Sequence, residues 1–213
     1  MLTLRIQQSC HRPGSVVLFS SLDSRYSAAP LMATVAECLA EREERVLLVD
    51  AVSPDRALLP VVNILPGSNG ASAAVNGKSK QPNALPATTP ETEAKPSAGL
   101  SEYLAEECDD VGDLIRPTSC PGVDLIASGR NGFPREAMAS SCLTELLKTC
   151  RRNYTMVLVH GPAVDCAADL QMLTARADGI VLAATPSVGK EPRARAIVQD
   201  LLDLGAPIIG LVA

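Results

Sequence analysis

The chain has 213 residues, of which 46% are hydrophobic and 20% are charged, and its formal net charge is −5. That balance is typical of a globular domain with a sizeable core, and an aromatic content of 2% without Trp predicts a core of aliphatic side chains. The acidic charge and the lack of any nucleic-acid-binding motif exclude broad binding to nucleic acids or to anionic membrane surfaces.

Residues 1–13 are interpreted as an extension that precedes one domain over residues 14–213. The extension lacks the long apolar stretch and the small-residue cleavage site of a secretory signal. No apolar run elsewhere in the chain approaches the length that spans a bilayer. We therefore expect a cytoplasmic protein without direct membrane insertion.

The first part of the domain reads as strand, helix and strand. Residues 14–19 form an apolar run that is typical of a strand buried on both faces. Apolar residues recur at helical spacing over residues 28–42, and residues 45–50 give a second buried strand that ends at Asp50. This order is typical of two parallel strands joined by a helix.

Residues 66–98 break the pattern, because they are rich in Pro, Ser, Asn, Ala, Thr and Gly and show no apolar periodicity. Such a composition buries too little apolar surface to offset the entropy that is lost on ordering. Long surface insertions also add little to the entropy of loop closure. We therefore expect a disordered insertion within one domain rather than a boundary between two.

The ordered pattern resumes with a helix over residues 99–107, for which Ser101 is the expected N-cap. The later expected elements are a short helix or turn at 111–118, strands at 123–129, 155–163, 179–185 and 207–213, and helices at 134–154 (with an alternative start at Ser140 or Ser141), 169–177 and 191–204. Apolar strands that alternate with helices predict an α/β fold, with a doubly wound, mostly parallel sheet and helices on both faces. Ligands of such sheets bind at the carboxyl ends of the strands.

Four phrases, in this order along the chain, resemble one family. They read "FSSLDSRYSAAPLMATVAECLAEREERVLLVDAV", "GLSEYLAEE", "IRPTSCPGVDLIASGRNGFPREAM" and "YTMVLVHGPAVDCAADLQMLTARADGIVLAA". The family is the P-loop ATPase domain of bacterial tyrosine kinases of exopolysaccharide and capsule biosynthesis, which is related to chromosome-partitioning and division-site ATPases. The resemblance runs from Gly14 to the last residue, apart from the insertion, and implies a P-loop NTPase-like fold.

The departures from the family fall on residues that handle the nucleotide. Where the family's phosphate loop reads "PGEGKST", this chain reads "DSRYSAA". The two loop glycines therefore fall at Ser24 and Tyr26, the lysine falls at Ser27, and the Ser/Thr pair falls at Ala28 and Ala29. In the family, the glycines let backbone N–H groups face the phosphates, the lysine neutralises them and a hydroxyl binds magnesium. The resemblance thus implies a degenerate Walker A loop without its side-chain functions.

Two further acidic positions of the family are altered. The first aspartate after the second strand is kept as Asp50, but its companion is Val52, and the Walker B aspartate falls at His160. A neutral imidazole is a poor ligand for a hard, oxygen-seeking ion. These losses together predict that nucleotide hydrolysis is absent and that no cofactor binds. The vestigial nucleotide-site positions, none of them catalytic, are Ser24, Tyr26, Ser27, Ala28, Asp50 and His160.

The corner around the loop keeps its framework. Ser27 is expected to N-cap the following helix, and Pro30 falls in its first turn, where no intrahelical N–H is needed. Asp23 would repel a phosphate. Tyr26 and Arg25 are expected either to fill the vacated pocket or to form a surface that another protein recognises.

Some residues have alternative interpretations. Asp50 is read as a relic carboxylate that caps a turn, with a metal ligand or a general base as alternatives. His160, Asp165, Cys166 and Asp169 form an alternative transition-metal site, although their spacing fits no known motif. Lys190, Arg193 and Arg195 are predicted to lie on a solvated helix face, with a subunit interface as the alternative. The seven cysteines, which include no CxxC pair, are predicted to be small, half-buried apolar residues.

The kept framework and the missing phosphate chemistry predict a catalytically inactive pseudo-ATPase or pseudokinase that regulates or scaffolds exopolysaccharide biosynthesis or chain-length control. The expected partner is a protein, either an active relative or a membrane chain-length regulator that recruits the chain to the inner face of the membrane, in a homo- or hetero-oligomer. The first alternative is a tyrosine kinase or ATPase with displaced catalytic groups, which uses Asp50 and a basic residue such as Arg25 or Lys190. The second alternative is a partitioning-type adaptor.

Overall fold

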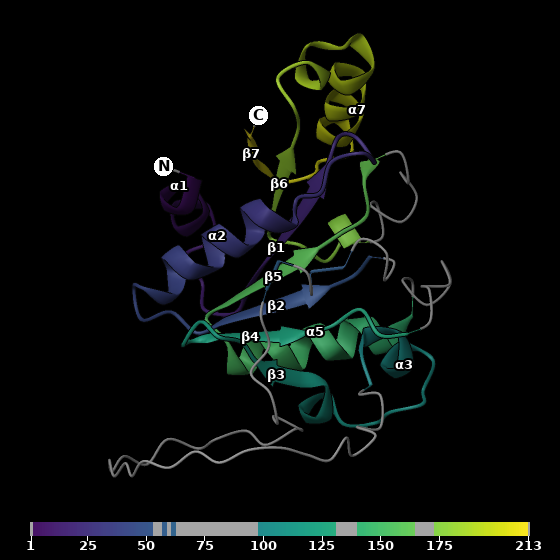
Figure 1. The fold of residues 1–213 in the computed structure, drawn as a ribbon. Coiled ribbons are helices and arrows are strands. Elements are labelled where there is room, and N and C mark those ends of the chain that lie inside the picture. Colours follow the sequence, from purple (N-terminus) through teal and green to yellow (C-terminus); the bar gives the residue numbers. More distant parts are fainter. Residues whose placement is uncertain are drawn as a thin grey trace, which may run out of the picture.

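The computed structural model describes residues 2–52, 57–58, 61–62, 98–130, 140–164 and 173–212 (Figure 1). The insertion expected at 66–98 lies outside these residues except for Ala98. So do residues 134–139 of the helix expected at 134–154 and residues 169–172 of the helix expected at 169–177.

Within the described part of the chain, the strands form one seven-stranded sheet in the order β3-β4-β2-β5-β1-β6-β7. They are β1 (Ser15–Ser21), β2 (Val46–Asp50), β3 (Ile115–Pro117), β4 (Val123–Ile126), β5 (Met156–His160), β6 (Gly179–Ala183) and β7 (Ile208–Val212). Neighbouring strands pair in parallel, except for the antiparallel pair of β3 and β4 at one edge. The prediction of a doubly wound, mostly parallel sheet is confirmed.

Helices cover both faces of the sheet (Figure 1). They are α1 (Leu2–Ser9), α2 (Ala29–Ala40), α3 (Leu100–Leu104), α5 (Ser141–Asn153) and α7 (Pro192–Asp203), with 3₁₀ turns η2 (Val111–Leu114) and η4 (Val188–Lys190). The buried side chains of α1 and α2 share one apolar cluster, and those of α3, α5 and α7 share the other. The chain is therefore layered as helix, sheet and helix.

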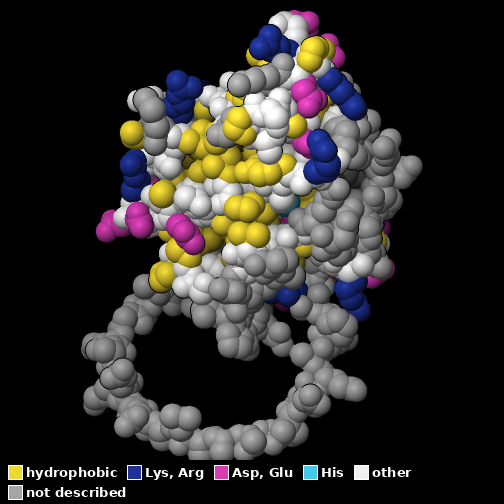
Figure 2. Space-filling model, turned by 45° about the horizontal axis from the view of Figure 1, so that its top comes forward, with side chains coloured by type: hydrophobic (Ala, Val, Ile, Leu, Met, Phe, Trp, Pro, Cys, Tyr) yellow, Lys and Arg dark blue, Asp and Glu magenta, His cyan; other side chains and the backbone are white. Residues whose placement is uncertain are grey.

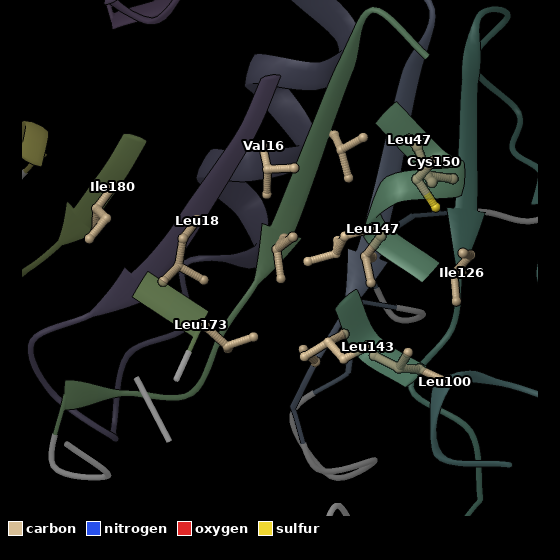
Figure 3. Packing of buried hydrophobic residues seen from close by; sticks show 14 of the residues in the cluster. Val16, Leu18, Leu47, Leu100, Ile126, Leu143, Leu147, Cys150, Leu173 and Ile180 are labelled. Carbon is tan, nitrogen blue, oxygen red and sulfur yellow. The ribbon is translucent and has the colours of Figure 1, made fainter. Parts of the chain in front are cut away.

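The core follows from the alternation of side chains along each strand. In β1, Val16 and Leu18 belong to the cluster under α5, whereas Val17 and Phe19 belong to the cluster under α2. Figure 3 shows Leu147 of α5 among the strand residues of the first cluster. Because both faces of the strands are buried, their sequences read as continuous apolar runs.

Several elements differ from the sequence-based expectation. No helix was predicted within residues 1–13, but α1 forms there and buries Ile6 in the cluster under α2. The segment expected as a short helix or turn at 111–118 does contain η2, but it continues into the edge strand β3. The expected restart of a helix after Ser140 is confirmed, since the Ser140 hydroxyl accepts a hydrogen bond from the Leu143 N–H.

The N-cap of α3 was predicted wrongly, because it is Gly99 and not Ser101. The Glu102 side chain accounts for the difference. Its carboxylate accepts hydrogen bonds from the Gly99 N–H at 2.7 Å and the Arg130 N–H at 2.9 Å. The side chain of Glu102, at the third helical position, therefore caps the N-terminus by accepting from the N-cap N–H, and the N-cap residue itself needs no side chain.

The described cysteines have the structural roles expected of them, and Tyr154 is also a buried structural residue. Six of the seven cysteines are described, all are free, and each is buried or half-buried. Burial raises the pKa of the Cys150 thiol to about 12, so this group stays protonated at neutral pH. The Tyr154 hydroxyl is buried and donates a hydrogen bond to Asp124 at 2.8 Å.

Among the described residues, no helix combines the length and the apolar character that crossing a membrane requires. The face in Figure 2 carries apolar side chains near its centre, with acidic and basic side chains interspersed around them. Among the described residues seen in this view, the basic side chains form no continuous patch of the kind that binds polyanions.

Candidate functional site

The candidate site lies where the central strands end. Because β1, β2, β5 and β6 are parallel, their carboxyl ends lie along one edge of the sheet. Register places His160 beside Phe19 on one side and beside Asp50 on the other. The loop between β1 and α2 starts at the same edge. Residues that are more than 100 positions apart in the sequence are thus brought together.

The loop after β1 is held by its own residues. The Leu22 N–H donates to the Ala183 carbonyl at 2.8 Å, which extends the pairing of β1 with β6. The Arg25 guanidinium donates to both carboxylate oxygens of Asp23 at 2.8–3.1 Å. This contact raises the pKa of Arg25. The two charges of the loop therefore face each other.

Tyr26 does not fill a pocket, contrary to one of the two expectations, because 41% of its surface is exposed. The side chain of Arg25 is also exposed, at 83%. The loop thus presents both side chains to solvent. Of the two expected arrangements, this geometry matches an open surface.

The start of α2 differs by one residue from the expectation. Its N-cap is Ala28, whose side chain has no polar atom, and not Ser27. Ser27 nevertheless accepts a hydrogen bond from the Ala29 N–H at 3.2 Å. Pro30 lies in the first turn, as predicted. The hydroxyl therefore supports the helix from one residue before the cap.

A buried pair, Asp50 and His160, occupies the centre of the site. Asp50 is 0% exposed and His160 is 3% exposed. The distance from His160 Nδ1 to Asp50 Oδ1 is 3.0 Å, and Asp50 Oδ2 accepts the Leu58 N–H at 2.6 Å. Both oxygens of the carboxylate thus have partners within the protein. The contact with Leu58 is the kind of turn cap that the sequence suggested for Asp50.

Ser27 completes this array. The distance from its Oγ to His160 Nε2 is 3.4 Å. The line of contacts therefore runs from an exposed hydroxyl through a buried imidazole to a buried carboxylate. Sequence reasoning named all three residues but did not predict their contacts, because the local sequence does not determine the register of β2 against β5.

The donor set is a poor fit for magnesium and nucleotide phosphates. Magnesium prefers six oxygen ligands in octahedral geometry, whereas an imidazole stands beside the only carboxylate of this array. No group of three or more His, Cys, Asp or Glu residues suited to a metal occurs in the part of the chain that the structure describes. Of the alternative transition-metal set, only His160 is described, and Asp165, Cys166 and Asp169 lie outside the described residues.

A pocket of about 230 Å³ adjoins the loop on the side of α7. Its charged lining residues are Asp23, Arg25, Glu191 and Arg193. Ser24 lines the same pocket and is half-buried. Because two acids and two bases line it, their formal charges cancel and the pocket has no net positive charge with which to attract phosphates. Arg195 is exposed on α7, and the side chain of Lys190 lies outside the description.

Comparison with known proteins gives the following matches. No protein-family model matches the chain. Over 88 residues the chain is 36% identical to the tyrosine-protein kinase EpsB of Ralstonia solanacearum. This match covers 41% of this chain and 12% of EpsB. The chain thus spans about an eighth of the length of that relative.

Two solved structures share the fold. The BceF tyrosine kinase domain has a TM-score of 0.68 at 20% identity, over 99% of this chain and 72% of that one. MinD of the Aquifex aeolicus MinC:MinD complex has a TM-score of 0.63 at 17% identity, over 93% of this chain and 68% of the matched one. The resemblance seen in the sequence, to bacterial tyrosine kinase domains and to their division-site ATPase relatives, is therefore confirmed, and the fold is P-loop NTPase-like.

Proposed function

We propose that the chain is a relative of the bacterial tyrosine kinase domains that is inactive as an ATPase and as a kinase, and that it acts by contact with another protein in exopolysaccharide biosynthesis or chain-length control. The carrying observation is the Asp50–His160 pair. In the resembled family, the corresponding two positions are acids, and the one at the position of His160 helps to hold magnesium. Here one is an imidazole that contacts the other.

The phosphate loop supports the same proposal. The position of the family's lysine is Ser27, and the nearest charged loop residue, Arg25, is paired with Asp23. A guanidinium that is held by a carboxylate gives less attraction to a phosphate than a free one. The fold is thus kept while the groups that would hold ATP and magnesium are replaced.

The role that we assign to the exposed loop is binding to another protein. Tyr26 and Arg25 project from it beside the pocket that α7 lines. Tyr and Arg are enriched at the centres of protein interfaces. MinD, which shares the fold, is found in a complex with MinC. We therefore favour an active kinase relative or a membrane chain-length regulator as the partner.

The alternative is an ATP-dependent kinase or ATPase with displaced groups, with Asp50 and a basic residue as the active pair. Asp50 is fully buried and engaged at both oxygens, and Arg25 is bound to Asp23. Neither side chain is poised for substrate in this arrangement. A partitioning-type adaptor would share the contact role and differ in its partner.

The test mixes the purified chain with an active bacterial tyrosine kinase domain of the resembled family. We expect a complex in size-exclusion chromatography with light scattering, and a change in the autophosphorylation rate of the kinase. Arg25→Ala together with Tyr26→Ala should weaken the complex, whereas Glu145→Ala, an exposed acid on α5, should not. ATP hydrolysis by the chain alone that disappears in Asp50→Ala would overturn the proposal in favour of an enzyme.

A further inference from the structure

The contacts of Ser27, His160 and Asp50 have the form of a nucleophilic triad. Oγ of Ser27 lies 3.4 Å from His160 Nε2, and Nδ1 of the same ring lies 3.0 Å from Asp50 Oδ1. A nucleophile is recognised by a base within hydrogen-bond reach and by a third group that orients the base, and these distances are often longer without substrate. The three residues meet both conditions.

The hydrogen-bond pattern assigns the protons. An ionised carboxylate only accepts hydrogen bonds, and Asp50 already accepts from the Leu58 N–H through its other oxygen. Nδ1 of His160 must therefore carry the proton that faces Asp50. In the neutral imidazole, Nε2 then carries the lone pair, and it faces the hydroxyl of Ser27. This tautomer is the one in which an imidazole acts as a general base.

The exposure of the three residues falls from the nucleophile to the general base to the positioning carboxylate, as nucleophilic catalysis requires. Ser27 is exposed, His160 is almost fully buried and Asp50 is fully buried. The base thus lies almost fully buried behind the nucleophile, and the nucleophile can meet a substrate. Ser27 also lies between the end of β1 and the start of α2, and nucleophilic serines occupy strand–turn–helix corners in other α/β proteins, where the order along the chain is also Ser, Asp, His.

The corner also offers donors for a developing negative charge. The first backbone N–H groups of α2 lack partners within the helix, and the helix dipole places partial positive charge there. In strand–turn–helix corners of this kind, the N–H of the residue after the nucleophile stabilises the oxyanion. In this chain that residue is Ala28, the N-cap of α2.

From these contacts we infer that Ser27 is an acyl-accepting nucleophile, with His160 as its general base and Asp50 as the residue that positions His160. The substrate class is a small carboxylic ester that reacts at the surface. Ser27 Oγ bonds to the carbonyl carbon as its proton passes to Nε2. The alkoxide then leaves with that proton, which gives an acyl-Ser27 ester. Water, deprotonated by Nε2, attacks the ester, and Ser27 is released with the carboxylic acid. This activity is separate from the nucleotide chemistry considered above.

The first test is covalent labelling with a fluorophosphonate probe, located by peptide mass spectrometry, with 4-nitrophenyl acetate as the test ester. We expect one adduct, at Ser27, that is absent in Ser27→Ala and unchanged in Ser119→Ala, which removes an exposed serine far from the imidazole. Ser24 in the same loop is an internal comparison. His160→Gln should lower the labelling rate by about 100-fold. No adduct, or similar labelling of Ser24 and Ser27, would overturn the inference.

The second test begins with the wild-type ring, so its first result stands even if His160→Gln does not fold. The chain has two histidines, and nitrogen-15 NMR with His11→Gln for assignment reports the ring of His160. The expected spectrum shows a protonated Nδ1 and an unprotonated Nε2. In Asp50→Asn, whose amide would donate to Nδ1, the proton should move to Nε2 and labelling of Ser27 should fall. An imidazolium or the opposite tautomer in the wild type would overturn the inference.

Discussion

Replacement of Asp50 by alanine tests the role of the buried pair in stability. The carboxylate of Asp50 accepts from His160 Nδ1 at 3.0 Å and from the Leu58 N–H at 2.6 Å, with 0% of the residue exposed. Asp50→Ala leaves both donors buried without an acceptor. Each unsatisfied buried donor costs about 1–3 kcal/mol, and the substitution leaves two of them. We therefore expect the free energy of unfolding to fall by about 2–6 kcal/mol.

Urea unfolding measures this change. Because the chain has no Trp, far-ultraviolet circular dichroism is the suitable signal. At a slope of about 2 kcal/mol per molar urea, the midpoint should fall by about 1–3 M.

The matched control is Glu145→Ala. Glu145 pairs with Lys148 at 2.7 Å, but both side chains are more than half exposed, at 63% and 57%. Such a pair contributes little because water screens it, so the change should stay within about 0.5 kcal/mol. If Asp50→Ala lies within about 1 kcal/mol of the wild type, the reasoning that both oxygens of Asp50 are essential acceptors is refuted.

Three further predictions concern the framework around the site. Glu102→Gln should destabilise the chain at neutral pH: although burial raises the pKa of Glu102, hydrogen bonds from backbone N–H groups outweigh it and hold the pKa below its ordinary value of 4.5. The stabilisation is thus present above pH 4.5 and is lost as the pH falls through the folded-state pKa, so urea midpoints of the two proteins should converge in acid and a constant difference would contradict this. Gly129→Ala, at φ +91°, would place its Cβ against the Ser101 and Glu102 side chains, whereas Gly205→Ala, at φ +74°, meets open space. Both variants carry a backbone strain of about 1–3 kcal/mol, and Gly129→Ala should destabilise the chain clearly more than that. Equal shifts in melting temperature would refute the predicted steric clash at Gly129. Tyr154→Phe removes a part-buried hydrogen bond to the Asp124 carboxylate and should cost about 1.5 kcal/mol in the same urea assay, whereas an unchanged midpoint would show that the hydroxyl contributes nothing.

The sheet was predictable because its strands are buried on both faces and read as apolar runs between helical patterns. The edge strand β3 was not, since Ile115, Arg116 and Pro117 form too short and too polar a run to signal a strand. Helix α1 was missed because a single buried residue, Ile6, anchors it. The cap of α3 was misassigned because Glu102 supplies it from inside the helix.

The candidate site was only partly predictable. Resemblance located Ser27, Asp50 and His160 at strand ends, and the sequence alone showed that the phosphate loop lacks glycines and lysine. The contact between Asp50 and His160 depends on the adjacency of β2 and β5, whose residues are paired across 110 positions of sequence. The orientation of Tyr26 depends on the backbone of a loop that no apolar pattern constrains.

Isothermal titration of the chain with ATP in the presence of magnesium tests the central claim most directly. The account predicts no binding heat at micromolar concentrations, because the loop has no lysine and the carboxylate of Asp50 is held by His160 and the Leu58 N–H. An active bacterial tyrosine kinase domain, titrated in parallel, provides the positive control. Micromolar binding of the nucleotide by this chain would contradict the account.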